Sequence, residues 1–359
     1  MKFADVLEIK NGRNQKQVEN PNGKYPIYGS GGIMGWADAY ICEADTVVIG
    51  RKGTINNPIY VDRPFWNVDT AFGLAAKREI LLPKYLYYFC CYFDFESLNT
   101  TVTIPSLTKA NLLNIEINVP SMDEQMQVVN KLNQVAELIS LRKKQISKLD
   151  QLVKSRFIEL FGDGQYPKVA LIDLVEEGAG LSYGIVQPGD DGTGDMGVLR
   201  PVDMVDGKIS TASIKYIDRS IGDGFRKTEL TGDELLITVR GTTGITALTD
   251  NRFIGMNVTR GIAVVRYDRN KINPVYLNAY LNTDESQRYI KEHTRGATLQ
   301  QINLSDLRVQ EIVVPPKEQQ EQMAAFVEQT DKSKFDNPAE PRQTGIAEKI
   351  PNAGILWVR

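Results

Sequence analysis

The chain has 359 residues, which is enough for more than one hydrophobic core, and 42% of them are hydrophobic, which excludes a disordered protein. No apolar run reaches the roughly 18 residues that a membrane span needs, so we expect no membrane association. The net charge of −3 excludes a uniformly basic nucleic-acid binder. Cys42, Cys90 and Cys91 have neither disulfide nor metal spacing, which favours the cytoplasm.

The first 120 residues predict a compact module of strands and short helices. A β-branched run at Thr46 to Ile49 predicts a strand, and the turn residues Arg51-Lys52-Gly53-Thr54 follow it. A short helix is expected after Pro83, from Tyr85 to Phe93. A last strand is expected from Ile115 to Pro120.

A long helix is predicted from residue 121 to residue 162. No Gly or Pro occurs from Ser121 to Phe161, and Ser121 with Glu124 has the form of a capping box. Apolar residues then recur at spacings of three and four for more than four heptads, which is typical of a coiled coil. Gly162 ends the pattern. The basic stretch from Arg142 to Arg156 is read either as a solvated face or as a strip close to DNA or an acidic partner.

The stretch from 163 to 315 repeats the first module with a period of about 190 residues, as the pair Asp45 and Asp233 shows. Four further segments of the first half match the second half in the same order. They are Arg51 to Thr54 with Arg240 to Thr242, Phe65 to Gly73 with Phe253 to Gly261, Leu82 to Leu86 with Asn273 to Leu277, and Val119 to Gln125 with Val314 to Gln320. The pattern predicts an α+β fold in which two similar domains are joined by a long coiled-coil helix.

A second helix is expected to follow Pro316, but its apolar pattern extends only to about residue 335. Beyond Asp336, residues such as Pro338, Pro341 and Gly345 exclude a helix. Residues 336–359 are therefore interpreted as an atypical tail, either out of the ancestral reading frame or a flexible end.

This order of segments resembles the specificity subunit of type I restriction-modification enzymes. The resemblance rests on the repeated modules, on Lys24 to Gly32 with Val48 to Gly53, and on Val314 to Gln320 before the second helix. It covers residues 1 to 334, and it assigns 1–120 and 163–315 as target-recognition domains. The departure is the shortened distal helix, since in the family two such helices pack antiparallel.

The resemblance implies a non-catalytic subunit that reads a bipartite double-stranded DNA sequence. It also implies partner methyltransferase subunits and restriction or translocase subunits, which would bring S-adenosylmethionine, ATP and Mg, with no cofactor in this chain. Self-association through the coiled coil is a further expectation. Two alternatives stay open: a coiled-coil scaffold that binds other proteins, and an inactive, truncated specificity allele.

Candidate DNA contacts are polar and basic residues on glycine-rich loops, because Arg, Lys, Asn, Gln, Ser and Thr read base edges and phosphates. In the first module they are Tyr28, Ser30, Arg51, Lys52, Thr54, Thr101, Thr103, Ser106 and Lys109. In the second module they are Arg240, Thr242, Thr243, Arg260, Arg295, Thr298, Gln300 and Gln301. Ser106 and Gln301 lie at equal distances before the junction proline.

Catalytic motifs are not found. Gly192 to Gly197 has the form G-x-G-x-x-G, but no clear strand precedes it and no helix follows, so we predict a turn. The sole histidine, His293, has no neighbouring His or Cys for a zinc site.

Overall fold

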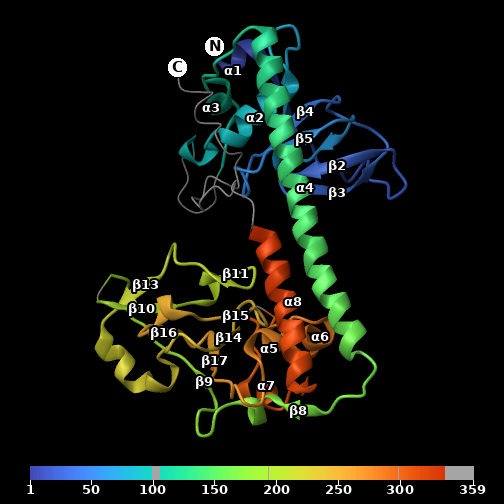
Figure 1. Cartoon of the computed structure of the whole chain (residues 1–359). Helices are drawn as coiled ribbons and strands as arrows, with labels where there is room; N and C mark the ends of the chain where they lie inside the picture. The colour runs from blue at the N-terminus through green and yellow to red at the C-terminus, as the bar shows by residue number, and fades with distance from the viewer. Residues whose placement is uncertain (99–105, 193, 298, 336–359) are drawn as a thin grey trace. The chain divides into compact units, whose positions relative to one another are not determined.

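The computed structural model describes residues 1–98, 106–192, 194–297 and 299–335 (Figure 1). The described chain forms two compact units that divide between Lys143 and Lys144, here called unit 1 and unit 2. Both units combine helices with antiparallel strands, which confirms the predicted α+β class.

Unit 1 is built on a four-stranded antiparallel sheet with the order β1-β7-β4-β5. Its strands are β1 (Leu7–Asn11), β4 (Thr46–Gly50), β5 (Ile59–Val61) and β7 (Ala71–Ala76). Every residue of β4 is buried, because this β-branched strand is covered on both faces. The predicted strand at Thr46 to Ile49 is therefore confirmed.

A second, three-stranded sheet completes the strands of unit 1. It has the order β3-β2-β6, in which β2 pairs antiparallel with β3 and parallel with β6. Its strands are β2 (Tyr25–Gly29), β3 (Gly32–Ala37) and β6 (Trp66–Asn67). The short helices of unit 1 are α1 (Phe3–Val6), α2 (Pro83–Tyr92), η1 (Phe95–Leu98) and α3 (Lys109–Leu113).

Unit 2 repeats both sheets with the same order and directions. The four-stranded sheet is β9-β17-β14-β15 and the three-stranded sheet is β13-β10-β16, again with one parallel pair, β10 with β16. The strands are β9 (Leu181–Tyr183), β10 (Met196–Leu199), β13 (Lys215–Ile217), β14 (Leu235–Thr238), β15 (Thr246–Leu248), β16 (Asn257–Val258) and β17 (Ile262–Val265).

The remaining elements of unit 2 include four helices, α5 (Pro274–Leu281), α6 (Asp284–His293), α7 (Leu304–Arg308) and α8 (Lys317–Phe335). A hairpin of β11 (Met204–Val205) and β12 (Lys208–Ile209) lies between β10 and β13, and β8 (Lys168–Ala170) pairs with β18 (Glu311–Val313). The 3₁₀ helices are η2 (Leu171–Leu174), η3 (Pro201–Asp203), η4 (Arg219–Thr228) and η5 (Asn251–Phe253).

Equivalent tyrosines show that the duplication reaches individual side chains. The hydroxyl of Tyr85 on α2 donates to the carbonyl of Asn118 at 3.1 Å, and that of Tyr276 on α5 donates to the carbonyl of Val313 at 2.8 Å. Both tyrosines are buried. The two predicted modules therefore share one fold.

The predicted strand from Ile115 to Pro120 is wrong. Only Glu116 forms a bridge, with Lys2, and hydrogen bonds from Phe3 to Ile115 and from Ile117 to Met1 flank it. Pairing stops there because helix α1 begins at Phe3. In unit 2 the corresponding strand β18 finds a three-residue partner in β8 and forms a regular ladder.

Helix α4 (Met122–Phe161) is a continuous helix of 40 residues, which confirms the predicted long helix. The Glu124 N–H donates to the Ser121 hydroxyl at 3.4 Å and the Ser121 N–H donates to the Glu124 carboxylate at 3.0 Å, which are the two bonds of a capping box. Leu132 is buried in unit 1, and Phe157 and Phe161 are buried in unit 2.

Helix α8 packs antiparallel beside the last turns of α4 within unit 2 (Figure 1). Met323 and Val327 share a core with Phe157, and the Lys334 ammonium lies 2.7 Å from the Asp150 carboxylate. A helix predicted to end near residue 335 is therefore present. The predicted atypical tail, 336–359, lies outside the described residues.

Candidate nucleic-acid interface

In unit 2 the chain brings two loops together at the end of β14. Arg240 and Gln301 form a β-bridge, the Gly241 N–H donates to the Gln300 carbonyl at 2.9 Å, and the Ile302 N–H donates to the Val239 carbonyl at 3.0 Å. These backbone bonds hold Arg240 next to Gln301, although 60 residues separate them in sequence. The loop after β14 and the segment before α7 thus form one surface.

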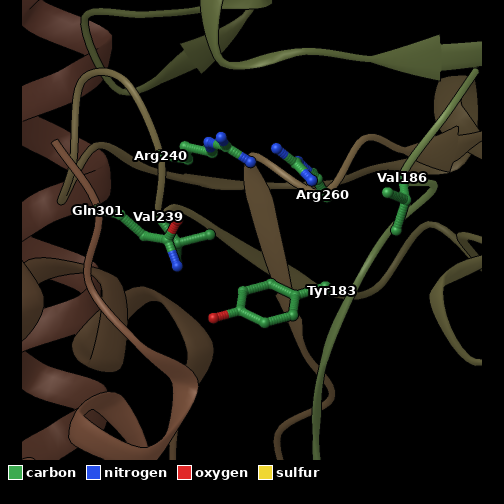
Figure 2. Close-up of a pocket in the computed structure, with 6 residues that line it drawn as sticks. All are labelled: Tyr183, Val186, Val239, Arg240, Arg260 and Gln301. Carbon is green, nitrogen blue, oxygen red and sulfur yellow. The ribbon is translucent and has the colours of Figure 1, made fainter. Parts of the chain in front are cut away.

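Arg260 reaches the same surface from the turn between β16 and β17. Its backbone N–H donates to the Ile185 carbonyl at 2.8 Å. Figure 2 shows the guanidinium groups of Arg240 and Arg260 directed toward each other above the Tyr183 ring. The pocket between them has a volume of about 230 Å³, and its lining residues are Tyr183, Val186, Val239, Arg240, Arg260 and Gln301.

The charge in this pocket is not neutralised. Among the residues that the structure describes, no carboxylate lies within ion-pair distance of Arg240 or Arg260. By contrast, Arg269 is paired with Asp233 at 2.6 Å and Arg252 with Asp250 at 2.7 Å. Two unpaired guanidinium groups in one place favour an anionic or acceptor-rich ligand, such as DNA.

Unit 1 has an equivalent surface with different side chains. Lys52 and Ser106 form the bridge that Arg240 and Gln301 form in unit 2. The flanking bonds are the same: the Leu107 N–H donates to the Arg51 carbonyl at 2.9 Å, and the Arg51 N–H donates to the Thr70 carbonyl at 2.8 Å. In unit 2 the Val239 N–H donates to the Gly261 carbonyl at 2.8 Å. Thr70 and Gly261 are therefore equivalent.

This hydrogen-bond register corrects one of the sequence matches between the two units and adds one residue to the candidate site of unit 1. The match of Phe65 to Gly73 with Phe253 to Gly261 places Gly73 opposite Gly261, whereas the hydrogen bonds place Thr70 there. The turn before β16 is three residues longer than the turn before β6, and an alignment of sequence blocks without gaps does not show this difference. The corrected register puts Asp69 at the place of Arg260, and Asp69 was not among the predicted site residues.

The other candidates of unit 1 lie at different places. An added Cβ on Gly50 would come within 2.9 Å of the Ser30 Cβ and 2.0 Å of the Thr54 carbonyl oxygen, so Ser30 and Thr54 lie beside the end of β4. Tyr28 packs its ring edge-on against Phe65 with centroids 5.4 Å apart, and the Lys109 ammonium donates to the Ile9 carbonyl at 3.0 Å. Thr101 and Thr103 lie outside the described residues.

Of the other candidate DNA contacts in unit 2, some are exposed beside the pocket and others have partners within the unit. Thr242 and Gln300 are exposed beside Gly241, whereas the Thr243 hydroxyl lies 3.0 Å from the Thr294 hydroxyl and has an internal partner. Arg295 pairs through its backbone with Gln301, and its guanidinium lies 3.7 Å from Asp306. Thr298 lies outside the described residues.

A close crossing of two chain segments fixes each site, and the sequence gives no sign of it. An added Cβ on Gly184 would come within 1.9 Å of the Val258 carbonyl oxygen, and one on Gly12 within 1.7 Å of the Val68 carbonyl oxygen. Gly184 lies between Tyr183, which lines the pocket, and Ile185, which accepts the bond from Arg260. A lone glycine after a strand is compatible with many turns.

The described ranges contain no cluster of side chains that could hold a metal ion. Three or more His, Cys, Asp or Glu residues never cluster there as metal ligands would. His293 stacks on Tyr289 with ring centroids 4.0 Å apart, and burial raises the pKa of Cys42 to about 12, so that thiol stays protonated. Met196 begins strand β10, so no helix follows Gly192. Nor does any described helix have the length and apolarity of a membrane span.

The model of the type I restriction modification DNA specificity domain family matches residues 1–151 and 202–342 of this chain. The chain belongs to this family. This membership confirms the predicted resemblance. Specificity subunits of type I systems are non-catalytic, which confirms the prediction that the chain is not an enzyme.

Individual relatives of this specificity chain are distant. The type I restriction enzyme EcoBI specificity subunit of Escherichia coli is 20% identical over 337 residues, which cover 86% of this chain and 70% of that subunit. The solved S subunit of M. genitalium is 16% identical, with a TM-score of 0.52 over 93% of this chain and 89% of that one. The solved HsdS subunit of Thermoanaerobacter tengcongensis is 18% identical, with a TM-score of 0.38 over 93% and 89%.

Proposed function

We propose that this chain reads a bipartite double-stranded DNA sequence, one half with each unit. The observation that carries the proposal is the duplicated surface at the ends of β4 and β14. In unit 2 this surface presents Arg240 and Arg260 without a carboxylate partner among the described residues, and in unit 1 it presents Lys52 beside Ser106. Both surfaces lie on backbone held by sheet hydrogen bonds, which keeps the side chains in place for recognition.

In this proposal residues 1–120 and 163–315 form the recognition domains, and residues 121–162 and 316–335 form the helical segments. The net charge of −3 is compatible with DNA binding because Arg240 and Arg260 lie together on one surface of unit 2, whatever the total charge of the chain. Partner methyltransferase subunits would supply further phosphate contacts, and restriction subunits would act on the same complex. S-adenosylmethionine, ATP and Mg would belong to these partners, in the cytoplasm.

Exposed leucines on α4 support the docking of partner subunits. Leu138 and Leu141 are 65% and 53% exposed, and Leu152 is 49% exposed. Large apolar side chains on a solvated helix face are typical of a protein interface. We propose that this face receives the methyltransferase subunits.

The test measures binding of the chain, assembled with its methyltransferase subunits, to double-stranded DNA at increasing salt. We expect a steep decrease in affinity with salt, because bound DNA releases counterions. Arg240→Ala should weaken binding by about 1–3 kcal/mol. Arg252→Ala, which removes an arginine already paired with Asp250, should leave binding unchanged. Salt-independent retention on DNA, or equal binding by Arg240→Ala, would contradict the proposal.

A further inference from the structure

The equivalent surfaces of the two units carry opposite chemistry at one position. Unit 2 has Arg240, Arg260 and Gln301 where unit 1 has Lys52, Asp69 and Ser106, as the shared bridges and hydrogen bonds establish. A hydrogen-bond donor of unit 2, Arg260, is thus replaced by an acceptor in unit 1. Because a donor is replaced by an acceptor at this position, the two surfaces do not prefer the same base there.

The side chains of unit 2 match the edge of guanine. In the major groove guanine presents two acceptors, N7 and O6, and a guanidinium group donates to both of them at once. Arg240 and Arg260 keep this capacity because no described carboxylate competes for their N–H groups. By contrast, the Arg269 guanidinium already donates to both carboxylate oxygens of Asp233, so it is not available for a guanine.

A phosphate alone does not account for this arrangement. A phosphate only accepts hydrogen bonds, whereas the Gln301 amide beside the two guanidinium groups both donates and accepts, as the edge of a base pair requires (Figure 2). The backbone of each arginine is fixed, Arg240 through its bridge with Gln301 and Arg260 through its bond to Ile185. Directional donors on a fixed frame are what base reading requires.

We propose that the half-site read by unit 2 contains guanine, recognised by Arg240 and Arg260. The half-site read by unit 1 then differs at the corresponding place. Asp69 there accepts a hydrogen bond, which suits the amino group of cytosine and repels the acceptor edge of guanine. The inference rests on the proposed function, and it explains why one duplicated fold would read an asymmetric sequence.

The experiment selects bound sequences from random double-stranded DNA with the chain assembled with its methyltransferase subunits. The native complex should yield two separated sequence parts. Arg240→Gln and Arg260→Gln should each reduce the preference for guanine at one position of one part by about tenfold or more, since a bidentate contact is lost. Lys52→Gln should alter only the other part, and Arg252→Gln should alter neither.

Three results would overturn the inference. One is a native motif in which the part changed by Arg240→Gln contains no G·C pair. Another is a uniform loss of affinity across all sequences for both arginine variants, which would make them phosphate contacts. The last is an unchanged motif. A native complex without any sequence preference would instead overturn the proposed function itself, so the two failures are distinguishable.

Discussion

Gln125 of helix α4 and Gln320 of helix α8 make the same hydrogen bonds in the two units. The Gln125 side-chain oxygen accepts from the Leu82 N–H and its amide donates to the carbonyls of Ile80 and Pro120, at 2.8, 2.9 and 3.0 Å. Gln320 accepts from the Asn273 N–H at 2.8 Å and donates to the carbonyls of Pro315 and Lys271 at 2.9 and 3.4 Å. Each amide ties the start of a long helix to the start of α2 or α5.

Replacement of Gln320 by Ala should destabilise unit 2. The side chain is only 2% exposed, so its loss leaves buried backbone groups without partners, at a cost of about 1–3 kcal/mol. Urea denaturation followed by circular dichroism measures the change. Gln322→Ala, two residues along α8 and exposed, is the matched control and should change stability by less than about 0.5 kcal/mol. Equal stabilities of the two variants would contradict the bridging role.

Gly184→Ala should disrupt the pocket of unit 2. The added methyl group would come within 1.9 Å of the Val258 carbonyl oxygen, a contact that only a shift of backbone relieves. We expect a loss of about 3 kcal/mol, because backbone groups must move to remove the overlap. Gly224→Ala, whose Cβ meets nothing within 4 Å, is the control for thermal denaturation. If both variants melt alike, the close crossing is not required for the fold.

The exposed face of α4 can be tested separately from DNA reading. Leu138→Lys together with Leu141→Lys should abolish co-purification with the methyltransferase subunits, because buried ammonium groups at an apolar interface lack partners. The folded chain should keep its stability, since both leucines are more than half exposed. Ile254→Lys, which changes a 58% exposed residue of unit 2, is the control. Unimpaired assembly of the double variant would place the partner elsewhere.

The ion pair of Asp233 should make stability depend on pH in the acid range. Bonds from Arg269 and then Tyr267 hold the pKa of the Asp233 carboxyl below its ordinary value of 3.8. A depressed pKa in the folded chain means that this contribution is present above pH 3.8 and is lost as the pH falls through the folded value.

Asp233→Asn should therefore lower the free energy of unfolding at pH 7, and the difference from the native chain should shrink below about pH 4. We expect at most about 1 kcal/mol, because Asp233 is 47% exposed and its charge is screened. Asp223→Asn, whose arginine partner lies 3.6 Å away, is the control. A difference that stays constant down to pH 3 would contradict the assignment.

The sequence predicted those features that depend on local pattern. The heptads of α4, the β-branched run of β4 and the repeated Pro-x-Tyr-Leu at Tyr85 and Tyr276 each determine a structure from neighbouring residues alone. The loops that carry Arg240 and Gln301 were also found, because basic residues beside glycines mark a surface that a ligand approaches. Their DNA contacts remain a prediction.

Features that depend on distant partners were not predictable in the same way. The sequence from Ile115 to Pro120 is typical of a strand, but the segment that it pairs with becomes helical at Phe3. Only one bridge therefore forms, between Lys2 and Glu116. The equivalence of Asp69 with Arg260 follows from hydrogen-bond register rather than from residue identity. The crossing of Gly184 over Val258 is a three-dimensional contact between segments more than 70 residues apart.

We propose that two duplicated, non-catalytic units read DNA for a methyltransferase. The most direct measurement is a map of methylated adenines across the genome of a host strain with the gene and after its deletion. We expect a motif of two separated parts that is methylated in the first strain and unmethylated in the second. Identical methylation in the two strains would contradict it.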